Sequence, residues 1–288
     1  MTQQVVFITG ATDGLGRATA LLLAQRGYRV FAAGRSAEKR AQLDAVAREK
    51  KLPLETLTMD VCDDQSVKEG ITYVLAKAGA IDVLINNAGV VYVATVEELR
   101  MEDWRRQFET NFFGVIRVTQ AVLPHMRERR KGRIVMMSSV AGFVTPPTYG
   151  PYSATKHAME AISNALRLEL YPFGISTVLI EPGYIVTGIQ QASADLSKDY
   201  LGRSTGPYVK VYGSSRGSAN KSRAASGTTA EDCAAVILRA VEARNPRPRY
   251  TVTRLAFLAK WAKRLLPDSL QDALLRKNSG ITRDAAKN

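Results

Sequence analysis

The chain has 288 residues, of which 45% are hydrophobic and 23% are charged, and its formal net charge is +13. This ordinary globular composition allows one sizeable core, and two distant cysteines, Cys62 and Cys233, exclude a disulfide framework. We therefore expect free thiols and a cytoplasmic location. The excess of basic residues favours anionic ligands and carries no information about the fold. We expect neither a signal peptide nor a membrane span, because the first apolar run, 5–8, is short and no long apolar run follows.

Short apolar runs alternate with segments of helical period along most of the chain. Strands are expected at 5–9, 29–33, 54–59, 83–86, 133–137, 176–180 and 249–252, and helices at 16–26, 38–50, 64–78, 104–129, 152–171 and 230–243. Pro124 is expected to kink or shorten the fourth of these helices. Continuous apolar strands alternating with helices predict an α/β fold, a doubly wound parallel sheet of about seven strands in a single Rossmann-like domain.

Two regions depart from this alternation. Residues 188–227 are rich in Ser, Gly, Lys and Arg without a helical period, and a stretch of this length within a compact domain is usually a functional loop or a disordered one. Residues 253–288 form a basic, amphipathic C-terminal extension, in which Leu255, Leu258 and Leu265 share one helical face. This extension could pack on the body, cover the substrate site or make weak contact with an anionic membrane surface.

A glycine-rich turn joins the first strand to the first helix, in the sequence Thr-Gly-Ala-Thr-Asp-Gly-Leu-Gly at 9–16. Glycines at this point let the backbone approach a pyrophosphate, and the helix directs its free N–H groups at the phosphates. The turn therefore predicts a dinucleotide site, with a tight turn without ligand as the alternative. No Gly-Lys-Ser/Thr ends the turn, which disfavours a P-loop NTPase.

The second strand is followed by Arg35, and no acidic residue occurs before Glu38. An arginine at this place accommodates the 2′-phosphate of NADP, whereas NAD usually requires a carboxylate. We therefore predict NADP as the cofactor. NAD stays an alternative, in which Arg35 is an ordinary surface residue.

Tyr152 and Lys156 are four residues apart at the start of a predicted helix and therefore share a face. A free phenol titrates near pH 10, and a neighbouring ammonium lowers that pKa, so the pair is a candidate acid–base device. Ser139 follows the fifth predicted strand, at the end of a parallel sheet where ligands bind. A tyrosine and a lysine at this spacing can also be purely structural, and the motifs around them decide between the two interpretations.

Taken together, these motifs resemble the classical short-chain dehydrogenase/reductase family from Thr9 to Thr187. Ser139 stands thirteen residues before Tyr152, as in that family. The resemblance implies a catalytic set of Ser139, Tyr152, Lys156 and Asn111. It also implies that the cofactor is bound by Thr9, Gly10, Thr12, Gly14, Leu15, Gly16, Arg35, Asp60, Val61, Asn87, Ala88, Gly89, Tyr152, Lys156, Pro182, Gly183 and Thr187.

Each catalytic residue takes a role from this resemblance. Tyr152 would exchange a proton with the substrate oxygen, which Ser139 would orient. Lys156 would lower the phenol pKa and hold the nicotinamide ribose, and Asn111 would hold a water that relays protons to Lys156. One departure weakens the NADP prediction: members that prefer NADP often carry a basic residue where this chain has Asp13.

The resemblance implies an NADP(H)-dependent oxidoreductase that interconverts a carbonyl and a secondary alcohol. The expected substrate is hydrophobic, similar to a steroid, a retinoid or a long-chain oxo compound. The alternatives are an NAD-dependent alcohol dehydrogenase and a non-catalytic dinucleotide sensor, which is disfavoured because both Tyr152 and Lys156 are present. The resemblance also implies a catalytic domain spanning 1–252 with a substrate loop at 188–227, and a homodimer or homotetramer. We expect no metal site, since the two histidines lie in no ligand cluster, and no nucleic-acid partner, since neither a basic face with stacking aromatics nor a recognised binding module is found.

Overall fold

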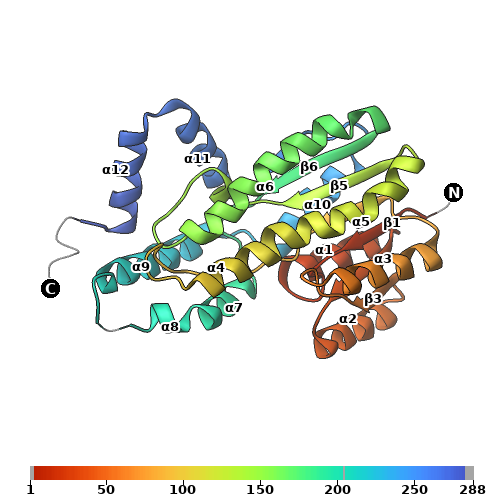
Figure 1. The fold of residues 1–288 in the computed structure, drawn as a ribbon, viewed down its shortest axis with the longest axis horizontal. Helices are drawn as coiled ribbons and strands as arrows, with labels where there is room; N and C mark the ends of the chain where they lie inside the picture. The colour runs from red at the N-terminus through yellow and green to blue at the C-terminus, as the bar shows by residue number, and fades with distance from the viewer. Residues whose placement is uncertain (1–2, 204, 283–288) are drawn as a thin grey trace.

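A computed structural model describes residues 3–203 and 205–282 of the chain, which form a parallel sheet covered by helices on both faces (Figure 1). The strand order is β3-β2-β1-β4-β5-β6-β7, and every neighbouring pair is parallel. The strands are β1 (Val5–Ile8), β2 (Arg29–Gly34), β3 (Leu54–Thr58), β4 (Val83–Asn86), β5 (Gly132–Met137), β6 (Ile175–Glu181) and β7 (Arg249–Thr251). The predicted doubly wound, seven-stranded sheet is confirmed.

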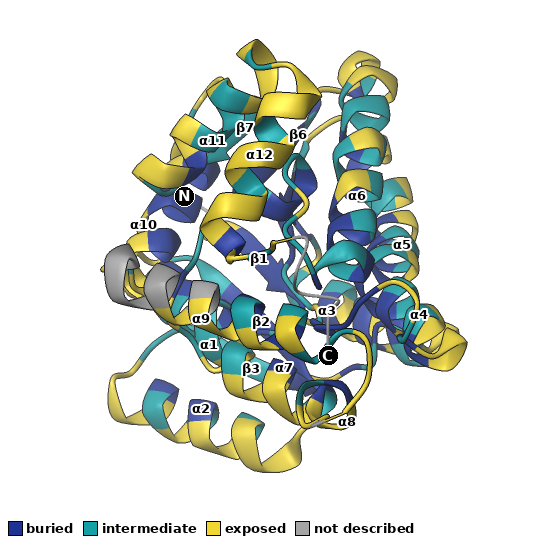
Figure 2. Cartoon of the chain, turned by 90° about the vertical axis from the view of Figure 1, so that its left-hand side faces the viewer, coloured by how far each residue is buried: buried dark blue, intermediate teal, exposed yellow. Residues whose placement is uncertain are grey.

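Two hydrophobic layers hold the helices on the sheet. In β1, Phe7 faces one layer and Ile8 the other, because successive side chains of a strand point to opposite faces. One layer packs under α3 (Asp64–Ala78), α5 (Gly114–Glu128) and α6 (Gly150–Glu169). The other packs under α1 (Gly14–Gln25), α2 (Ala37–Glu49) and α10 (Ala230–Glu242). Figure 2 shows the buried strands between these two groups of helices.

The helix predicted over 104–129 is divided into three parts. Helix α4 (Met101–Phe108) leads into a π-helical turn, η1 (Glu109–Phe113), and then into α5. Pro124 lies inside α5, so the expectation that it shortens the helix is wrong. Two short 3-10 turns, η2 (Val140–Gly142) and η3 (Tyr171–Phe173), flank α6.

The described part of 188–227 contains three helices, although the sequence there has no clear helical period. They are α7 (Ile189–Leu196), α8 (Lys198–Leu201) and α9 (Val209–Ser226). The Tyr200 and Tyr212 side chains are buried in a small cluster with Tyr92 and Leu99. Packing against the distant segment that contains Tyr92 and Leu99 holds the helices in place.

The C-terminal extension forms α11 (Arg254–Leu265) and α12 (Asp268–Ser279), which arch away from the body in Figure 1. Ala256 of α11 is buried, and Lys260 Nζ donates hydrogen bonds of 2.7 and 2.6 Å to the carboxylate of Glu181. One edge of α11 is therefore fixed to the end of β6.

Candidate active site

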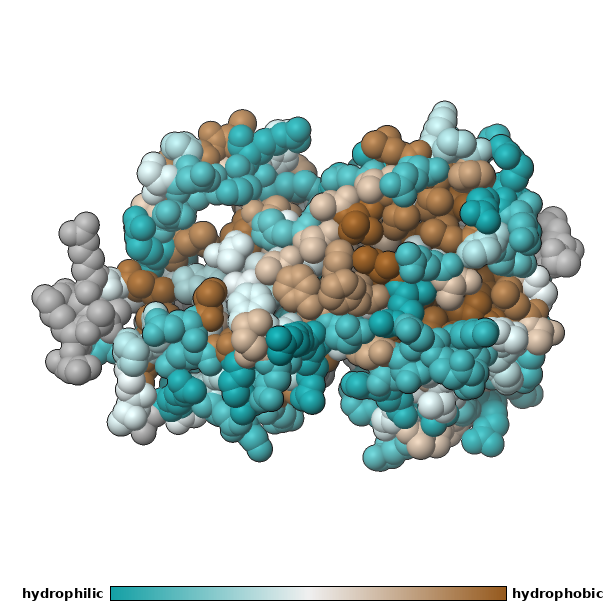
Figure 3. Space-filling view, viewed as in Figure 1, coloured by the Kyte–Doolittle hydropathy of each residue, from teal (hydrophilic) through white to brown (hydrophobic). Residues whose placement is uncertain are grey.

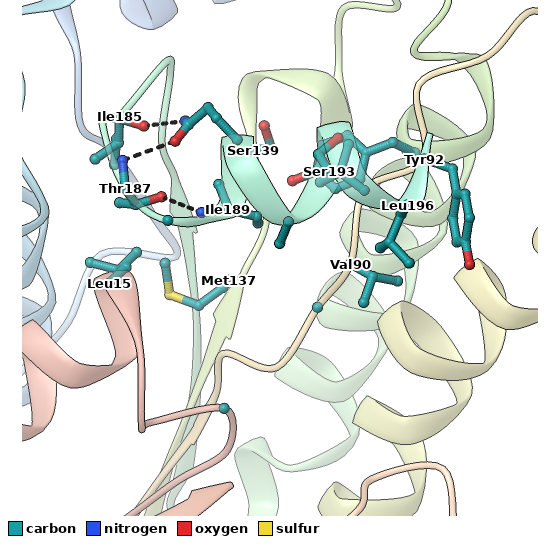
Figure 4. Close-up of a pocket in the computed structure, with 18 of the residues that line it drawn as sticks. Leu15, Val90, Tyr92, Met137, Ser139, Ile185, Thr187, Ile189, Ser193 and Leu196 are labelled. Carbon is teal, nitrogen blue, oxygen red and sulfur yellow. Dashed lines mark hydrogen bonds between the residues drawn. The ribbon is translucent and has the colours of Figure 1, made fainter. Parts of the chain in front are cut away.

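A single large cleft, with a volume of about 1980 Å³, runs across the carboxyl ends of the strands. The glycine turn and the loops after β2, β4, β5 and β6 all contribute to its lining, as do α6, α7 and α11. Parallel strands place their carboxyl ends at one rim of a sheet, which is why segments far apart in the sequence meet here. Figure 4 shows Ser139, Met137 and Thr187 around one part of this cleft.

The glycine turn fits a pyrophosphate. Gly10 and Gly14 have positive φ angles of 61° and 48°, which other residues rarely adopt. A Cβ at Gly16 would lie 2.2 Å from the carbonyl oxygen of Gly10, so the turn is closed to any larger residue. Helix α1 begins at Gly14 and directs its positive end into the cleft.

Thr9 and Asn87 fix the turn to the loop after β4. The Thr9 hydroxyl oxygen accepts hydrogen bonds from the backbone N–H groups of Asn87 and Ala88, each 3.1 Å long. The Asn87 amide donates to the carbonyl oxygens of Thr9 and Gly10. Thr9 is buried behind the cleft wall, so it positions the turn, whereas Asn87, Ala88 and Gly89 line the cleft.

Two basic side chains flank the end of the cleft beyond β2. Arg35 is 67% exposed, and its guanidinium lies 3.6 Å from the Asp60 carboxylate. Lys39, which the sequence analysis did not single out, also lines the cleft and forms an ion pair with Asp13. The hydrogen bond from Lys39 holds the pKa of Asp13 below its usual value. The carboxylate that weakened the NADP prediction is thus paired with a cation.

Ser139, Tyr152 and Lys156 come together in the cleft. The Lys156 Nζ donates a 2.6 Å hydrogen bond to the carbonyl oxygen of Met137, the last residue of β5. It lies 5.5 Å from the centre of the Tyr152 ring. Ser139 caps η2 by accepting a 3.1 Å hydrogen bond from the N–H of Ala141. The end of β5 and the first two turns of α6 therefore carry the three groups to one place.

Burial disfavours the charged forms of both Tyr152 and Lys156. Desolvation raises the pKa of Tyr152 to about 12, against a hydrogen bond with Ser139 that lowers it. Desolvation also lowers the pKa of Lys156 to about 8, against the Glu160 carboxylate, which raises it. In the protein alone, burial and the hydrogen bond with Ser139 are the main influences on the pKa of Tyr152, and the lowering by Lys156 stays a prediction.

Glu160 lies one helical turn beyond Lys156 and was not predicted as part of the site. Its carboxylate accepts a 2.5 Å hydrogen bond from the Ser138 hydroxyl and one of 3.1 Å from Arg249. Burial raises the pKa of Glu160. Its position at i+4 from a candidate lysine, on the same helical face, is the signal that could have identified it.

Asn111 lies in the π-helical turn η1 and is fully buried. Its Oδ1 accepts a 2.8 Å hydrogen bond from the N–H of Val90, and its Nδ2 donates to the carbonyl oxygen of Val90 and to the Thr155 hydroxyl. Among the described residues that line the cleft, Asn111 does not appear. Its side chain fastens the loop after β4 to α6, and its water-holding role stays a prediction.

The loop after β6 forms another part of the cleft wall. Pro182, Gly183 and Thr187 all line it. The Thr187 hydroxyl accepts a 3.3 Å hydrogen bond from the N–H of Ile189, and the Thr187 N–H donates to Gln190 (Figure 4). Thr12, Leu15 and Val61 line the cleft as well, so Thr9 and Asn111 are the two predicted site residues that lie behind its wall.

The rest of the cleft is largely apolar. Ile189, Leu196 and Leu201 line it, as the sequence analysis considered, whereas Tyr200, Tyr208 and Tyr212 do not appear among its lining residues. Leu255 of the C-terminal extension lines it as well, and further contributors that the sequence did not indicate are Val91, Val93, Pro146, Pro147, Tyr149 and Tyr184. These residues come from loops and helix ends without a common period, so only the folded chain brings them together.

Comparison with known proteins gives consistent matches. A family model described as short chain dehydrogenase matches residues 4–197. An uncharacterized oxidoreductase, YusZ of Bacillus subtilis, is 42% identical over 195 residues, which cover 67% of this chain and 69% of that protein. The NADPH-dependent 3-dehydrocapnine reductase of Ornithobacterium rhinotracheale is 33% identical over 281 residues, covering 94% and 95%.

A solved structure shares the fold as well. It is a short chain dehydrogenase/reductase of Burkholderia phymatum in complex with NAD, with a TM-score of 0.80 and 26% identity. The alignment covers 94% of this chain and 95% of that one.

Proposed function

Because the chain belongs to the short-chain dehydrogenase family, and is an oxidoreductase of alcohol and carbonyl groups with a nicotinamide dinucleotide cofactor, we propose that it uses NADP(H) on a hydrophobic ketone or secondary alcohol. The meeting of Ser139, Tyr152 and Lys156 in one cleft with the glycine turn carries this proposal. The residues around Gly10 and Gly16 suit a bound pyrophosphate, because neither position leaves room for a side chain.

The side chains of the site supply the proton chemistry, while the bound nicotinamide supplies or accepts the hydride. In carbonyl reduction, Ser139 and Tyr152 donate hydrogen bonds to the substrate oxygen, and Tyr152 gives up its proton as negative charge develops there. The ammonium group of Lys156 lies beside the Tyr152 ring and stabilises the phenolate that results. In alcohol oxidation the same groups act in the opposite direction.

Two cations support NADP over NAD. Arg35 and Lys39 line the same end of the cleft, where a 2′-phosphate would add negative charge. The similar 3-dehydrocapnine reductase is named as NADPH-dependent. The alternative is an NAD-dependent alcohol dehydrogenase. Asp60 favours it, because its carboxylate lies near Arg35 and could accept a hydrogen bond from a ribose hydroxyl.

The apolar lining supports a hydrophobic substrate. Val93 and Tyr149 line the cleft, as do Ile189 and Leu196 of α7, in the substrate segment 188–227. A similar protein of Bacteroides thetaiotaomicron is named 3-ketodihydrosphingosine reductase, and one of Bos taurus retinol dehydrogenase 8. We therefore propose a steroid-, retinoid- or long-chain-oxo-like compound.

A series of methyl ketones of increasing chain length tests the substrate and the cofactor together. The consumption of NADPH and of NADH is measured at 340 nm with each ketone. We expect kcat/KM to increase with chain length, and NADPH to be used more efficiently than NADH. Equal use of NADH would overturn the cofactor assignment, and a preference for the shortest ketone would overturn the substrate class.

We propose a homodimer or homotetramer formed through the helices that carry Asn111 and Tyr152. Phe113, the last residue of η1, is 48% exposed and Leu168, at the end of α6, is 66% exposed, so both helical segments present apolar side chains to solvent. Light scattering on the purified chain measures the assembly. Cys62 and Cys233 are free thiols, which suits a reducing compartment, and a cytoplasmic location stays a prediction.

A further inference from the structure

The pair α11 and α12 concentrates exposed apolar side chains at one end of the molecule. Of the fifteen exposed large apolar residues in 3–203 and 205–282, seven lie on these two helices: Leu255, Phe257, Leu258, Trp261, Leu265, Leu270 and Leu274. Isolated exposed apolar residues are ordinary, but a contiguous group of this kind marks an interaction surface. Figure 3 shows apolar side chains on this pair of helices and a hollow beneath them.

The edge of α11 that packs on the body is distinct from its apolar face. Ala256 and Lys260 are four residues apart and contact the body, as the bond from Lys260 to Glu181 shows. Leu258, Trp261 and Leu265 are three and four residues apart and share another side of the helix, and 63%, 47% and 72% of their surfaces are exposed. The extension therefore packs on its own protein without covering this face.

All the charged residues of the same helix are basic. Helix α11 carries four basic residues and no acidic one, namely Arg254, Lys260, Lys263 and Arg264. Lys260 pairs with Glu181 and Lys263 with Asp268 of α12, so among the described residues Arg254 and Arg264 are the cations of this helix without an ion pair. Large apolar side chains, a tryptophan and long basic side chains on one helix fit a membrane interface, where basic heads reach anionic phosphates beside buried apolar groups. A second copy docked on this face by a two-fold axis would bring these cations against their equivalents, which disfavours self-association.

The same helices border the cleft. Leu255 and Ala256 of α11 and Ser279 of α12 are among the residues that line it. No helix in the part of the chain that the structure describes combines the length and hydropathy needed to cross a bilayer. We propose that α11 and α12 bind the surface of an anionic lipid bilayer and lie along it, with the cleft beside the lipid. Direct entry of a hydrophobic substrate from the bilayer then rests on the proposed function, whereas the binding itself does not.

Vesicle flotation of the full chain, without cofactor or substrate, tests the proposal. The vesicles contain either phosphatidylcholine alone or two parts phosphatidylcholine to one part phosphatidylglycerol. We expect the chain to float with the anionic vesicles and much less with the neutral ones. Leu258→Gln with Leu265→Gln should weaken flotation by about tenfold or more, because two large apolar side chains no longer enter the interface. The matched control, Val96→Gln with Met101→Gln, changes two side chains of similar exposure elsewhere in the chain and should float like the parent.

Tryptophan fluorescence gives a second measurement, since Trp104 and Trp261 are the two tryptophans of the chain. In the Trp104→Phe variant, emission should shift to shorter wavelength when anionic vesicles are added, and in Trp261→Phe it should not. Unchanged NADPH binding shows that each variant is folded. The proposal is overturned if the chain does not float, if it floats equally with both kinds of vesicle, or if the Leu258/Leu265 variant floats fully. It is also overturned if the Leu258/Leu265 variant has a smaller oligomeric state than the parent in the absence of vesicles, because the face would then be a contact between copies of the chain.

Discussion

The Lys156 ammonium lies 5.5 Å from the centre of the Tyr152 ring and donates its hydrogen bond to the carbonyl oxygen of Met137. The end of β5 thus holds the cation in place before any ligand arrives. Burial has set the pKa of Tyr152 at about 12 and that of Lys156 at about 8, so the protein alone keeps a protonated phenol beside a lysine close to its titration point. This is a suitable starting state for donating a proton to a carbonyl oxygen.

Removing the phenol hydroxyl should abolish most of the turnover. Tyr152→Phe takes away the only proposed proton donor, and we expect kcat to fall by roughly 100- to 10,000-fold. NADPH binding, followed by fluorescence titration, should stay within about threefold of the parent. The control is Tyr149→Phe, a second tyrosine of the same cleft, which should retain turnover. Substantial activity in Tyr152→Phe would rule out the proposed acid.

The pH dependence of carbonyl reduction should report Lys156. Its lowered pKa means that the ammonium is present below about pH 8 and is lost as the pH rises through that value. We therefore expect kcat to decline above about pH 8, while the phenol of Tyr152 remains protonated. Because the Glu160 carboxylate raises the lysine pKa, Glu160→Gln should move this limb to lower pH.

The control for that shift is Glu169→Gln, an exposed carboxylate on the same helix. Its pH profile should match the parent. A limb that does not move in Glu160→Gln would show that another group controls the decline.

Cofactor preference should depend on two cations. Arg35→Ala and Lys39→Ala should each raise KM for NADPH by roughly tenfold or more, because each removes a charge-assisted contact to the 2′-phosphate. KM for NADH should change little, since NADH lacks that phosphate. Arg17→Ala serves as the control, as Arg17 lies on α1 and is not among the described residues that line the cleft. Equal losses with both cofactors would contradict the assignment.

The glycine turn should tolerate no added methyl group at Gly16. A Cβ there would lie 2.2 Å from the Gly10 carbonyl oxygen and 2.5 Å from the Asn87 amide nitrogen. We expect Gly16→Ala to lower the free energy of unfolding by roughly 1–3 kcal/mol and to weaken NADPH binding. In contrast, a Cβ at Gly213 of α9 meets no described atom within 4 Å. Gly213→Ala should raise the free energy of unfolding by roughly 0.4–1 kcal/mol, measured by urea denaturation.

Local patterns in the sequence predicted the strands and helices of this protein and its candidate catalytic residues. The seven strands follow from short continuous apolar runs and the six core helices from a period of 3.6 residues, which neighbouring residues specify by themselves. The shared face of Tyr152 and Lys156 follows from their spacing on one helix, and the sharp turn at 9–16 from its glycines.

The tertiary structure decided what depends on contacts between distant segments. Burial raises the pKa of Tyr152, and the partner of Lys156 is a carbonyl nineteen residues earlier in the chain. Lys39 meets Asp13 only when α2 packs beside the glycine turn. The helices within 188–227 have little period of their own and form because Tyr200 and Tyr212 are buried against another segment. Such contacts depend on how the chain packs as a whole, and residue spacing carries no record of them.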